Sequence, residues 1–401
     1  MRRAVSAQIL LLLCSLALTL GALELGARFY LHRLAGEEEF LLYAALDDLG
    51  KRRLAMGRNP TERRYEAHRY LGYVPARSYS DEKNRHNALG FRGEEIEVPK
   101  PPGEFRIACL GGSTTYGRGV KEYALAYPQL LEAELGSRGH GSVRVINAGA
   151  EGYTSWESLL NLEFRVLDLE PDLVISYDGI NDVHARLVWP SEAYRGDNSG
   201  RRATSALPQD VPGPFEHSAL VRILLVRWGR IAPHSELART LDPGADTYYA
   251  PEFWKQWRRG SYPQGIFREA TAAEMFAANP PVYFQRNLRS MVAVARAHGA
   301  EAMLATYAFS PRRHHPTSAS AEYIHAIGEM NEAMRAVARE TGAHLFDFAA
   351  AFPDEPGYYV DGQHVNAKGS RLQARLFADY LVASGLLPPV GIAAADPVAV
   401  R

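Results

Sequence analysis

The sequence predicts a doubly wound α/β domain on a parallel sheet of five strands, with an apolar helix at the N-terminus and a large insertion. Three observations predict this arrangement. Short apolar runs alternate with helical patterns from Phe105 onward, short turns join them, and one gap of about a hundred residues interrupts the alternation. Strands that alternate with helices form a parallel sheet whose two faces the helices cover.

The first element is an uncharged run of twenty residues, Ala4–Leu23, which follows Arg2 and Arg3. Twenty helical residues span about 30 Å, the thickness of the hydrocarbon core of a bilayer. The apolar region of a cleaved signal peptide is shorter, and here the run passes directly into a further helical pattern. We therefore expect residues 1–34 to form an uncleaved signal anchor, with a buried helix of a soluble protein as the alternative.

The charges around this helix bear on its orientation. Arg2 and Arg3 favour a cytoplasmic N-terminus, whereas Arg28 and Arg33 lie close to the other end. Large domains are translocated largely regardless of such charges. We expect the domain that follows to be extracytoplasmic, either periplasmic or at the cell surface.

Residues 35–103 are expected to form a stalk and a lead-in to the main domain. The pattern from Glu24 to about Leu71 is helical and heavily charged, with both signs interspersed, which predicts a solvated helical stalk. The stretch that follows is rich in turn residues and ends in "VPKPPGE". We expect this lead-in to be irregular and to pack on the main domain.

The main domain is expected over residues 104–387, and glycine or proline residues end several of its helical patterns. The predicted strands are Phe105–Leu110, Val143–Asn147, Asp172–Tyr177, Glu301–Tyr307 and Ala343–Phe348. The predicted helices are Tyr127–Gly136, Trp156–Leu169, Tyr283–His298, Ala321–Glu340 and Ala367–Ser384. The tail, residues 388–401, has no periodic pattern and is expected to be disordered.

The insertion covers about residues 183–280, far more than the usual length of a loop. It contains four of the five tryptophans, Trp189, Trp228, Trp254 and Trp257. Such aromatic side chains indicate a cap that shapes a substrate pocket or a small satellite core, and both can hold at once. The stretch Ser218–Ile231 is so apolar that we expect it to be buried, in the cap or at a membrane surface.

The glycine-rich turn "GGSTTYG" follows the first predicted strand. Arg118 and Gly119 stand where a Walker loop needs Lys and Ser or Thr, and the turn does not supply a G-x-G-x-x-G pattern. Thr115 stands where the nucleophile elbow of α/β-hydrolases has its last glycine. What remains is Ser113 at the carboxyl end of a strand, where open parallel sheets bind their ligands. A serine here can be a nucleophile or simply the N-cap of a helix.

Three further stretches carry groups that complement a nucleophile. In "YVDGQHVN", Asp361 lies three residues before His364, so its carboxylate can fix the tautomer of the imidazole and leave the other ring nitrogen as a general base. Gly152, after the second strand, offers a backbone N–H, and Asn181, after the third, offers a side-chain amide. With the N–H of Ser113, these make three donors for a developing oxyanion.

In combination, these blocks resemble the SGNH hydrolases, also called GDSL esterases and lipases. The matching blocks are "LGGSTTYG" with Ser113, "AEGYTS" with Gly152, "GIND" with Asn181, and "DGQH" with Asp361 and His364. The resemblance covers about Phe105–Asp182 and Tyr283–Leu387. The sequence departs from the family pattern at Gly112, where an aspartate that is not part of the triad usually precedes the serine.

The resemblance implies a three-layer α/β/α, flavodoxin-like fold and ester hydrolysis without a metal or a cofactor. It implies that Ser113 attacks an ester carbonyl while His364, aligned by Asp361, takes its proton. It further implies that the oxyanion lies against the N–H groups of Ser113 and Gly152 and the amide of Asn181. The expected substrate is an O-acyl or acetyl ester of a carbohydrate or lipid-like molecule.

Other functions compete on the same residues. An O-acyltransferase that modifies a cell-surface polysaccharide would use the same acyl-enzyme, and a binding protein could keep the fold without the chemistry. A formal net charge of −1 argues against a dominant nucleic-acid role. The adjacent His314 and His315 have no suitably spaced carboxylate and are expected to be solvated, so no metal site is expected. The expected partners are an acyl ester, small or polysaccharide, and the membrane.

Overall fold

The structure is a computed structural model that describes residues 2–45, 48, 64–68, 70–187, 191, 194–196, 217–230, 271–312 and 320–390. The chain divides into two compact units. The first unit consists of Met1–Thr61 and Thr204–Asp242, and the second consists of Glu62–Ala203 and Pro243–Arg401. The chain therefore leaves the second unit in its middle and later returns to it.

The second unit is built on a parallel sheet of five strands, as the sequence predicts. Its strands are β3 (Phe105–Gly111), β4 (Val143–Asn147), β5 (Leu173–Tyr177), β6 (Glu301–Ala305) and β7 (His344–Phe346). Their order is β4-β3-β5-β6-β7, and each neighbouring pair is parallel. Because the chain passes from β3 to β4 on one side and then to β5 on the other, the carboxyl end of β3 lies at the switch point of the sheet. Ligands of open α/β sheets bind at such a point.

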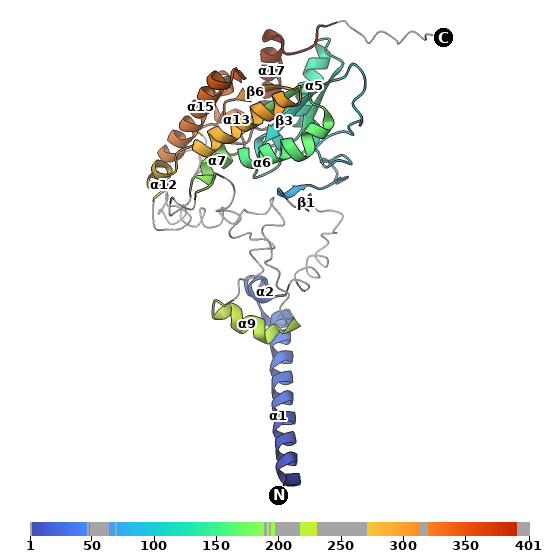
Figure 1. Ribbon diagram of the computed structural model, residues 1–401, viewed down its shortest axis with the longest axis vertical. Helices are drawn as coiled ribbons and strands as arrows, with labels where there is room; N and C mark the ends of the chain where they lie inside the picture. Colours follow the sequence, from blue (N-terminus) through green and yellow to red (C-terminus); the bar gives the residue numbers. More distant parts are fainter. Residues whose placement is uncertain are drawn as a thin grey trace, which may run out of the picture. The chain divides into compact units, whose positions relative to one another are not determined.

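Helices cover both faces of this sheet and complete three layers (Figure 1). Helices α5 (Tyr127–Ser137) and α17 (Ala367–Ala383) pack together on one face. Helices α6 (Ser155–Asn161), α13 (Val282–Ala297) and α15 (Ala321–Thr341) cover the other face. The predicted three-layer α/β/α class is confirmed.

Local signals set the ends of these helices. The hydroxyl of Ser320 caps α15 by accepting a hydrogen bond from the N–H of Tyr323 at 3.3 Å, and Gly342 ends the helix with φ of 66°. The predicted helix Trp156–Leu169 is interrupted in the structure: α6 is followed by a π-helical turn, Leu162–Val166, and a short 3₁₀ turn. Periodicity cannot distinguish these tighter and wider turns from regular helix.

The end of the expected helical stalk and the start of the irregular lead-in differ from their predictions, because each forms a short strand. Residues Tyr65–His68 form strand β1, where a helical pattern is expected, and pair antiparallel with β2 (Gly72–Pro75). The ring of Tyr65 is buried and packs with Leu71, Val74 and two residues of a later loop in a small second core. The helical prediction for Tyr65–His68 is therefore wrong, because this tertiary contact outweighs local propensity.

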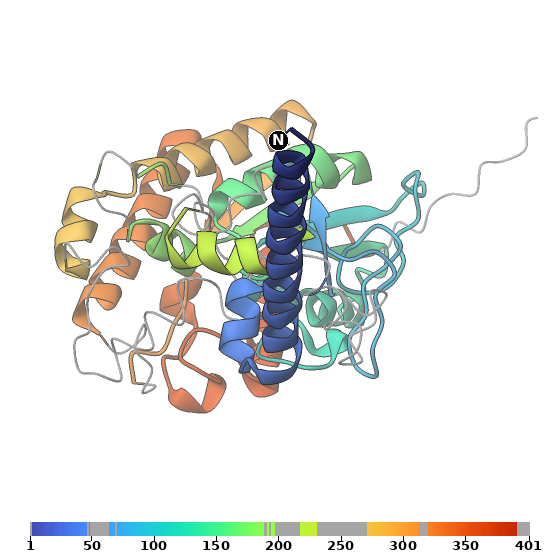
Figure 2. The same ribbon diagram turned by 90° about the horizontal axis from the view of Figure 1, so that it is seen from below.

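In the first unit, a short helix from the insertion lies across the long N-terminal helix (Figures 1 and 2). Helix α1 (Arg2–Phe29) continues through a π-helical turn, Tyr30–Leu34. Over Gln8–Leu34 it is long and apolar enough to cross a membrane, and most of its leucine side chains are exposed, whereas Leu31 in the π-helical turn is buried. Helix α9 (Ala219–Arg227), from the insertion, packs against α1 and against α2 (Glu37–Tyr43).

The contact between α1 and α9 is polar at its centre. The carboxylate of Glu24 accepts hydrogen bonds from the hydroxyl of Ser218 at 2.7 Å and from the N–H groups of Ala219 and Leu220 at 2.9 and 3.0 Å. Arg28 donates to the carbonyl of His217 at 2.6 Å. The described part of the apolar stretch Ser218–Ile231 thus packs on the N-terminal helix. These bonds satisfy N–H groups that a helix start leaves open.

The two ends of the insertion meet on the second unit. The guanidinium of Arg186 donates to the carbonyls of Asn279 and Phe276 at 2.6 and 2.8 Å, and the amide of Asn279 returns a bond to the carbonyl of Arg186 at 2.7 Å. Most of the insertion, including Trp189, Trp254 and Trp257, lies outside the described residues, as do residues 391–401 of the tail.

Candidate active site

The turn after β3 is shaped by glycines. Gly111 has φ of 149°, and a Cβ there would meet the Thr115 hydroxyl and the Tyr177 carbonyl. At Gly112, a Cβ would lie 2.5 Å from Nδ2 of Asn181 and 3.0 Å from the carbonyl oxygen of Tyr153. Gly112 therefore allows the backbone to approach Asn181 closely. An aspartate at this position, as in the family pattern, would require the side chain of Asn181 or the Tyr153 carbonyl to shift.

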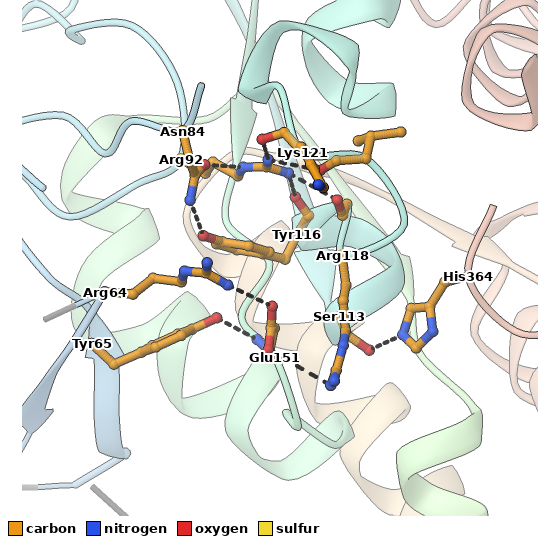
Figure 3. A network of polar contacts seen from close by, with 12 residues as sticks. Arg64, Tyr65, Asn84, Arg92, Ser113, Tyr116, Arg118, Lys121, Glu151 and His364 are labelled. Atoms are coloured by element: carbon orange, nitrogen blue, oxygen red, sulfur yellow. Dashed lines mark hydrogen bonds and ion pairs between the residues drawn. The ribbon is translucent and has the colours of Figure 1, made fainter. Parts of the chain in front are cut away.

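The structure brings Ser113, His364 and Asp361 into one hydrogen-bonded chain (Figure 3 shows its Ser113–His364 pair). Ser113 opens the short helix α4 (Ser113–Tyr116), and its Oγ lies 2.7 Å from Nε2 of His364. Nδ1 of His364 lies 2.7 Å from Oδ2 of Asp361. Ser113 and His364 are 7% and 9% exposed, so bulk water is largely kept from the pair.

Asp361 is held as an ionised carboxylate. Burial would raise its pKa, but the charge of His364, the ring N–H of that residue, and the backbone N–H groups of His364 and Gln363 stabilise the anion and hold the pKa well below its usual range. An ionised carboxylate only accepts hydrogen bonds, so Nδ1 of His364 must carry the proton. Nε2 is then free to accept the proton of the Ser113 hydroxyl.

The two other predicted donors follow the two strands that flank β3, Gly152 after β4 and Asn181 after β5. Asn181 is in α7 (Ile180–Ala185) after β5, is 8% exposed, and donates through Nδ2 to the carbonyl of Tyr153 at 2.8 Å. Gly152 follows β4 with φ of 82°. Because a Cβ at Gly112 would approach both Asn181 and Tyr153, the Gly152 loop and Asn181 adjoin the residue before the serine.

Buried carboxylates behind Asn181 were not anticipated from the sequence. Asp182 accepts bonds from the N–H and the hydroxyl of Ser155, and burial raises its pKa well above its usual range. Asp178 accepts from the hydroxyls of Ser158 and Ser176 at 2.8 Å each, and burial raises its pKa to about 6. These bonds fix both ends of the loop that presents Asn181. The "DGIND" sequence contains both acids, but nothing in it shows that they are buried.

Arg92 is a further residue that sequence reasoning missed. Its buried guanidinium donates to the carbonyls of Tyr116 at 2.5 Å and Gly117 at 3.0 Å, and to those of Val120 and Lys121 at 3.2 Å each (Figure 3). A cation at the carbonyl end of α4 is favourable because it satisfies orphan acceptors. Arg92 thus holds the turn that follows the serine helix.

The β1–β2 hairpin holds the Gly152 loop in a similar way. The Tyr73 hydroxyl donates to the carbonyl of Glu151 at 2.5 Å, and the Tyr153 hydroxyl donates to the carbonyl of Tyr73 at 2.5 Å. Glu151 N–H donates to the hydroxyl of Tyr65 at 3.4 Å, and Arg64 lies 3.5 Å from the Glu151 carboxylate. The lead-in therefore builds part of the site.

Among the described residues, no group of three His, Cys, Asp or Glu side chains could hold a metal ion. The predicted non-ligands His314 and His315 lie outside the described part of the chain. In the described residues, the side chains of the site are the hydroxyl of Ser113, the imidazole of His364, the carboxylate of Asp361 and the amide of Asn181.

The parallel α/β sheet holds Ser113 at its switch point, in one hydrogen-bonded chain with His364 and Asp361, and this arrangement is typical of serine hydrolases. Residues 109–372 match the model of the GDSL-like lipase/acylhydrolase family, which covers well over half of the 401 residues. The chain belongs to this family, and it is an ester hydrolase. The resemblance drawn from the motif blocks is confirmed at the level of the family.

The chain is similar to several solved structures. LAE5, an α/β hydrolase from the metagenome of Lake Arreo in Spain, is 20% identical, with 71% of this chain and 97% of that chain covered and a TM-score of 0.40. A lipase/acylhydrolase from Enterococcus faecalis is 17% identical, with 71% of this chain and 98% of that chain covered and a TM-score of 0.40. The acetyl xylan esterase AlAXEase is 16% identical, with 69% of this chain and 100% of that chain covered and a TM-score of 0.39. A search of curated proteins found no match.

Proposed function

We propose that this protein is a serine esterase that works through an acyl-enzyme formed on Ser113. The observation that carries the proposal is the chain from Ser113 Oγ through His364 to Asp361, with both links at 2.7 Å. His364 accepts the hydroxyl proton as Ser113 attacks the ester carbonyl, and the nearby carboxylate stabilises the imidazolium that forms.

In the tetrahedral intermediate, the substrate oxygen would carry the charge. The N–H groups of Ser113 and Gly152 and the amide of Asn181 are the proposed donors to it. Asn181 uses one hydrogen of Nδ2 for the Tyr153 carbonyl, which leaves the other hydrogen for the oxyanion. A donor that is already oriented by one bond loses little freedom when the oxyanion forms.

Collapse of this intermediate releases the alcohol, which takes its proton from His364. A water molecule then repeats the sequence: it loses a proton to His364, attacks the acyl carbon and releases the acid from Ser113. The proposed substrate is an O-acyl ester, such as an acetyl ester of a carbohydrate or lipid-like molecule. If a sugar hydroxyl replaces water in the second half, the same acyl-enzyme makes the protein an O-acyltransferase.

We also propose that α1 anchors the protein in a membrane with the second unit outside the cytoplasm. The length and composition of Gln8–Leu34 support a membrane span. Glu24 further supports an anchor that stays attached to the protein, because its carboxylate is bonded to the start of α9. A surface carbohydrate or lipid ester would then lie within reach.

The test is fluorophosphonate labelling of the full-length protein in detergent micelles or nanodiscs. Wild type is expected to be labelled, and Ser113→Ala is expected to lose the label completely. Ser370→Ala, which removes a buried hydroxyl bonded to the carbonyl of Leu125, is the matched control and should label like wild type. A folded wild-type protein that takes no label would contradict the serine mechanism. Acetyl esters assayed with and without sugar acceptors then separate hydrolysis from transfer.

A further inference from the structure

The main chain of Arg118 and Gly119 contacts both the serine helix and the histidine loop of the proposed active site. The N–H of Arg118 donates to the carbonyl of Ser113 at 2.9 Å. The next residue, Gly119, presses against the histidine loop, because a Cβ there would meet the Val365 carbonyl and lie 3.3 Å from Cβ of His364. Arg118 therefore projects from the wall that joins the two groups.

The side chain of Arg118 extends toward the proposed oxyanion loop. Its Nη1 lies 3.8 Å from Oε2 of Glu151, the residue before Gly152. Figure 3 shows this guanidinium between Glu151 and Ser113. A cation thus stands beside the place where the substrate must approach the nucleophile.

Glu151 does not accept a hydrogen bond from the guanidinium of Arg118. The distance of 3.8 Å is an ion pair and too long for a hydrogen bond. Glu151 also faces Arg64 at 3.5 Å, so two cations share one carboxylate. The Arg118 side chain is 50% exposed, and its guanidinium donates no hydrogen bond to any group in the described ranges. Its N–H donors are therefore available to a ligand.

Three ionisable side chains near Arg64 and Glu151 are neutral and do not oppose the arginines. Burial raises the pKa of Tyr65 well above its usual range and that of Tyr116 to about 12, so both phenols are neutral. Burial lowers the pKa of His86 to about 4, so it is neutral as well. Arg92 adds a further buried positive charge behind them. Against these cations, Glu151 is the carboxylate that faces Arg118.

We infer that Arg118 forms an anion subsite beside Ser113, and that the preferred ester carries a carboxylate or phosphate close to its scissile bond. A guanidinium matches the planar oxygens of such groups and can bind them through two parallel hydrogen bonds. The anion can belong to the acyl half, as in a dicarboxylate monoester, or to the alcohol half, as in an acylated uronate sugar. This inference rests on the proposed function of Ser113, since it names the substrate class for that site.

The test compares charged and neutral esters on the full-length protein in detergent micelles. Nitrophenyl hemisuccinate against nitrophenyl butyrate probes the acyl half, and acetylated glucuronate against acetylated glucose probes the alcohol half. In at least one pair, the wild type is expected to favour the anionic ester in kcat/KM by about tenfold, a typical value for a charged hydrogen bond. In Arg118→Gln this ratio should fall to about one. In wild type, about 1 M NaCl should bring the ratio closer to one, because salt screens the charge of Arg118.

Arg289→Gln is the matched control, because Arg289 on α13 has a side chain of similar exposure, 41%, and pairs with Glu340. It should retain the wild-type ratio in both pairs. The inference is overturned if wild type shows no preference for the anionic ester in either pair, or if both variants change the ratio equally. If no ester is hydrolysed, the proposed function fails instead. Binding of free succinate and glucuronate to Ser113→Ala, compared with its Arg118→Gln derivative by saturation-transfer NMR, then still decides whether the anion subsite exists.

Discussion

The guanidinium of Arg92 lies 4.6 Å from the centre of the Tyr116 ring and donates to the carbonyl of the same tyrosine at 2.5 Å. Tyr116 ends the short helix that Ser113 begins, whereas Arg92 precedes the family-matched residues 109–372. The lead-in is thus part of the machinery that orients the serine. The proposed nucleophile lies on a helix of one turn, which needs such external support because isolated turns are not stable alone.

Arg92→Met is expected to slow fluorophosphonate labelling of Ser113 at least tenfold and to destabilise the protein by about 3 kcal/mol, since it leaves several buried carbonyls without a donor. Arg165→Met is the control: Arg165 also holds the lead-in, at the carbonyls of Leu89 and Gly90, but does not contact α4. It should lower the melting temperature without slowing the labelling of the folded protein. Equal labelling rates in both variants would refute the role of Arg92.

Gly112→Asp, which restores the aspartate of the family pattern, is expected to lower kcat by about a hundredfold. Its Cβ would lie 2.5 Å from Nδ2 of Asn181, so the amide must move away from the oxyanion position. Gly136→Ala is the control because nothing lies within 4 Å of the added Cβ in α5, and it should keep wild-type activity. Steady-state kinetics on an activated ester measures both, and an unimpaired Gly112→Asp enzyme would speak against the proposed role of Asn181.

Asp361→Asn is expected to reduce kcat by about a thousandfold to ten-thousandfold, because an amide no longer enforces the proton on Nδ1 of His364. The low pKa of Asp361 means that it is ionised throughout the neutral and mildly acidic range, so its protonation should not produce the acidic limb of a pH–rate profile. Asp347→Asn, which breaks a surface pair with Arg335, should leave kcat near wild type. A fall in kcat of less than tenfold for Asp361→Asn would contradict the proposed triad.

His86 is expected to make the second unit sensitive to acid. Burial, followed by the charges of Arg92 and Arg64, lowers the pKa of His86 to about 4 in the folded protein, against about 6.5 when unfolded. The unfolded chain therefore binds more protons between these values. The resulting stability, about 3 kcal/mol, is present above pH of about 6.5 and is lost as pH falls through about 4.

His86→Gln should flatten this dependence, because glutamine can still bond to the Ala76 carbonyl and the Tyr116 hydroxyl but does not titrate. The measurement is the free energy of unfolding at several pH values. His325→Gln, at a side chain that is 77% exposed, should follow the wild-type curve. A variant His86→Gln with the full wild-type slope would rule out this histidine as the cause.

Glu24→Ala is expected to release the start of α9 from α1, since it removes the acceptor of three hydrogen bonds. Amide hydrogen exchange at Ala219 and Leu220 should accelerate at least tenfold in full-length protein held in nanodiscs. Glu39→Ala, which removes only a bond from the Tyr30 hydroxyl, should not affect these two amides. Unchanged exchange in Glu24→Ala would show that apolar packing alone holds α9.

The five strands could be predicted from the sequence because each is a short apolar run that helical patterns follow or flank. Burial of both sheet faces imposes that pattern on β3 and β5. The candidate site residues Ser113, Gly152, Asn181, Asp361 and His364 could be proposed because they follow strands or precede the last helix. Their catalytic roles stay predictions, whereas the family is confirmed.

The supports of the site could not be predicted in the same way. Arg92 and Tyr73 act through long-range bonds to backbone carbonyls, Arg92 at α4 and the turn after it and Tyr73 at the Gly152 loop, and such bonds leave no period in the sequence. The strand at Tyr65–His68 depends on pairing with β2 and on the burial of the Tyr65 ring. Neither contact is visible in the local sequence pattern, which favours a helix there. The role of the insertion as a cap stays a prediction, because most of it lies outside the described residues.

The bonds between Arg186 and Asn279 close the insertion at its base, while α9 from its middle is fastened to Glu24. A soluble version made by deleting only the N-terminal anchor would therefore leave the apolar face of α9 without its partner and invite aggregation. A soluble version that keeps the structure of the second unit therefore lacks both pieces of the first unit. Its chain is rejoined between Arg186 and Asn279, which are already held together by hydrogen bonds.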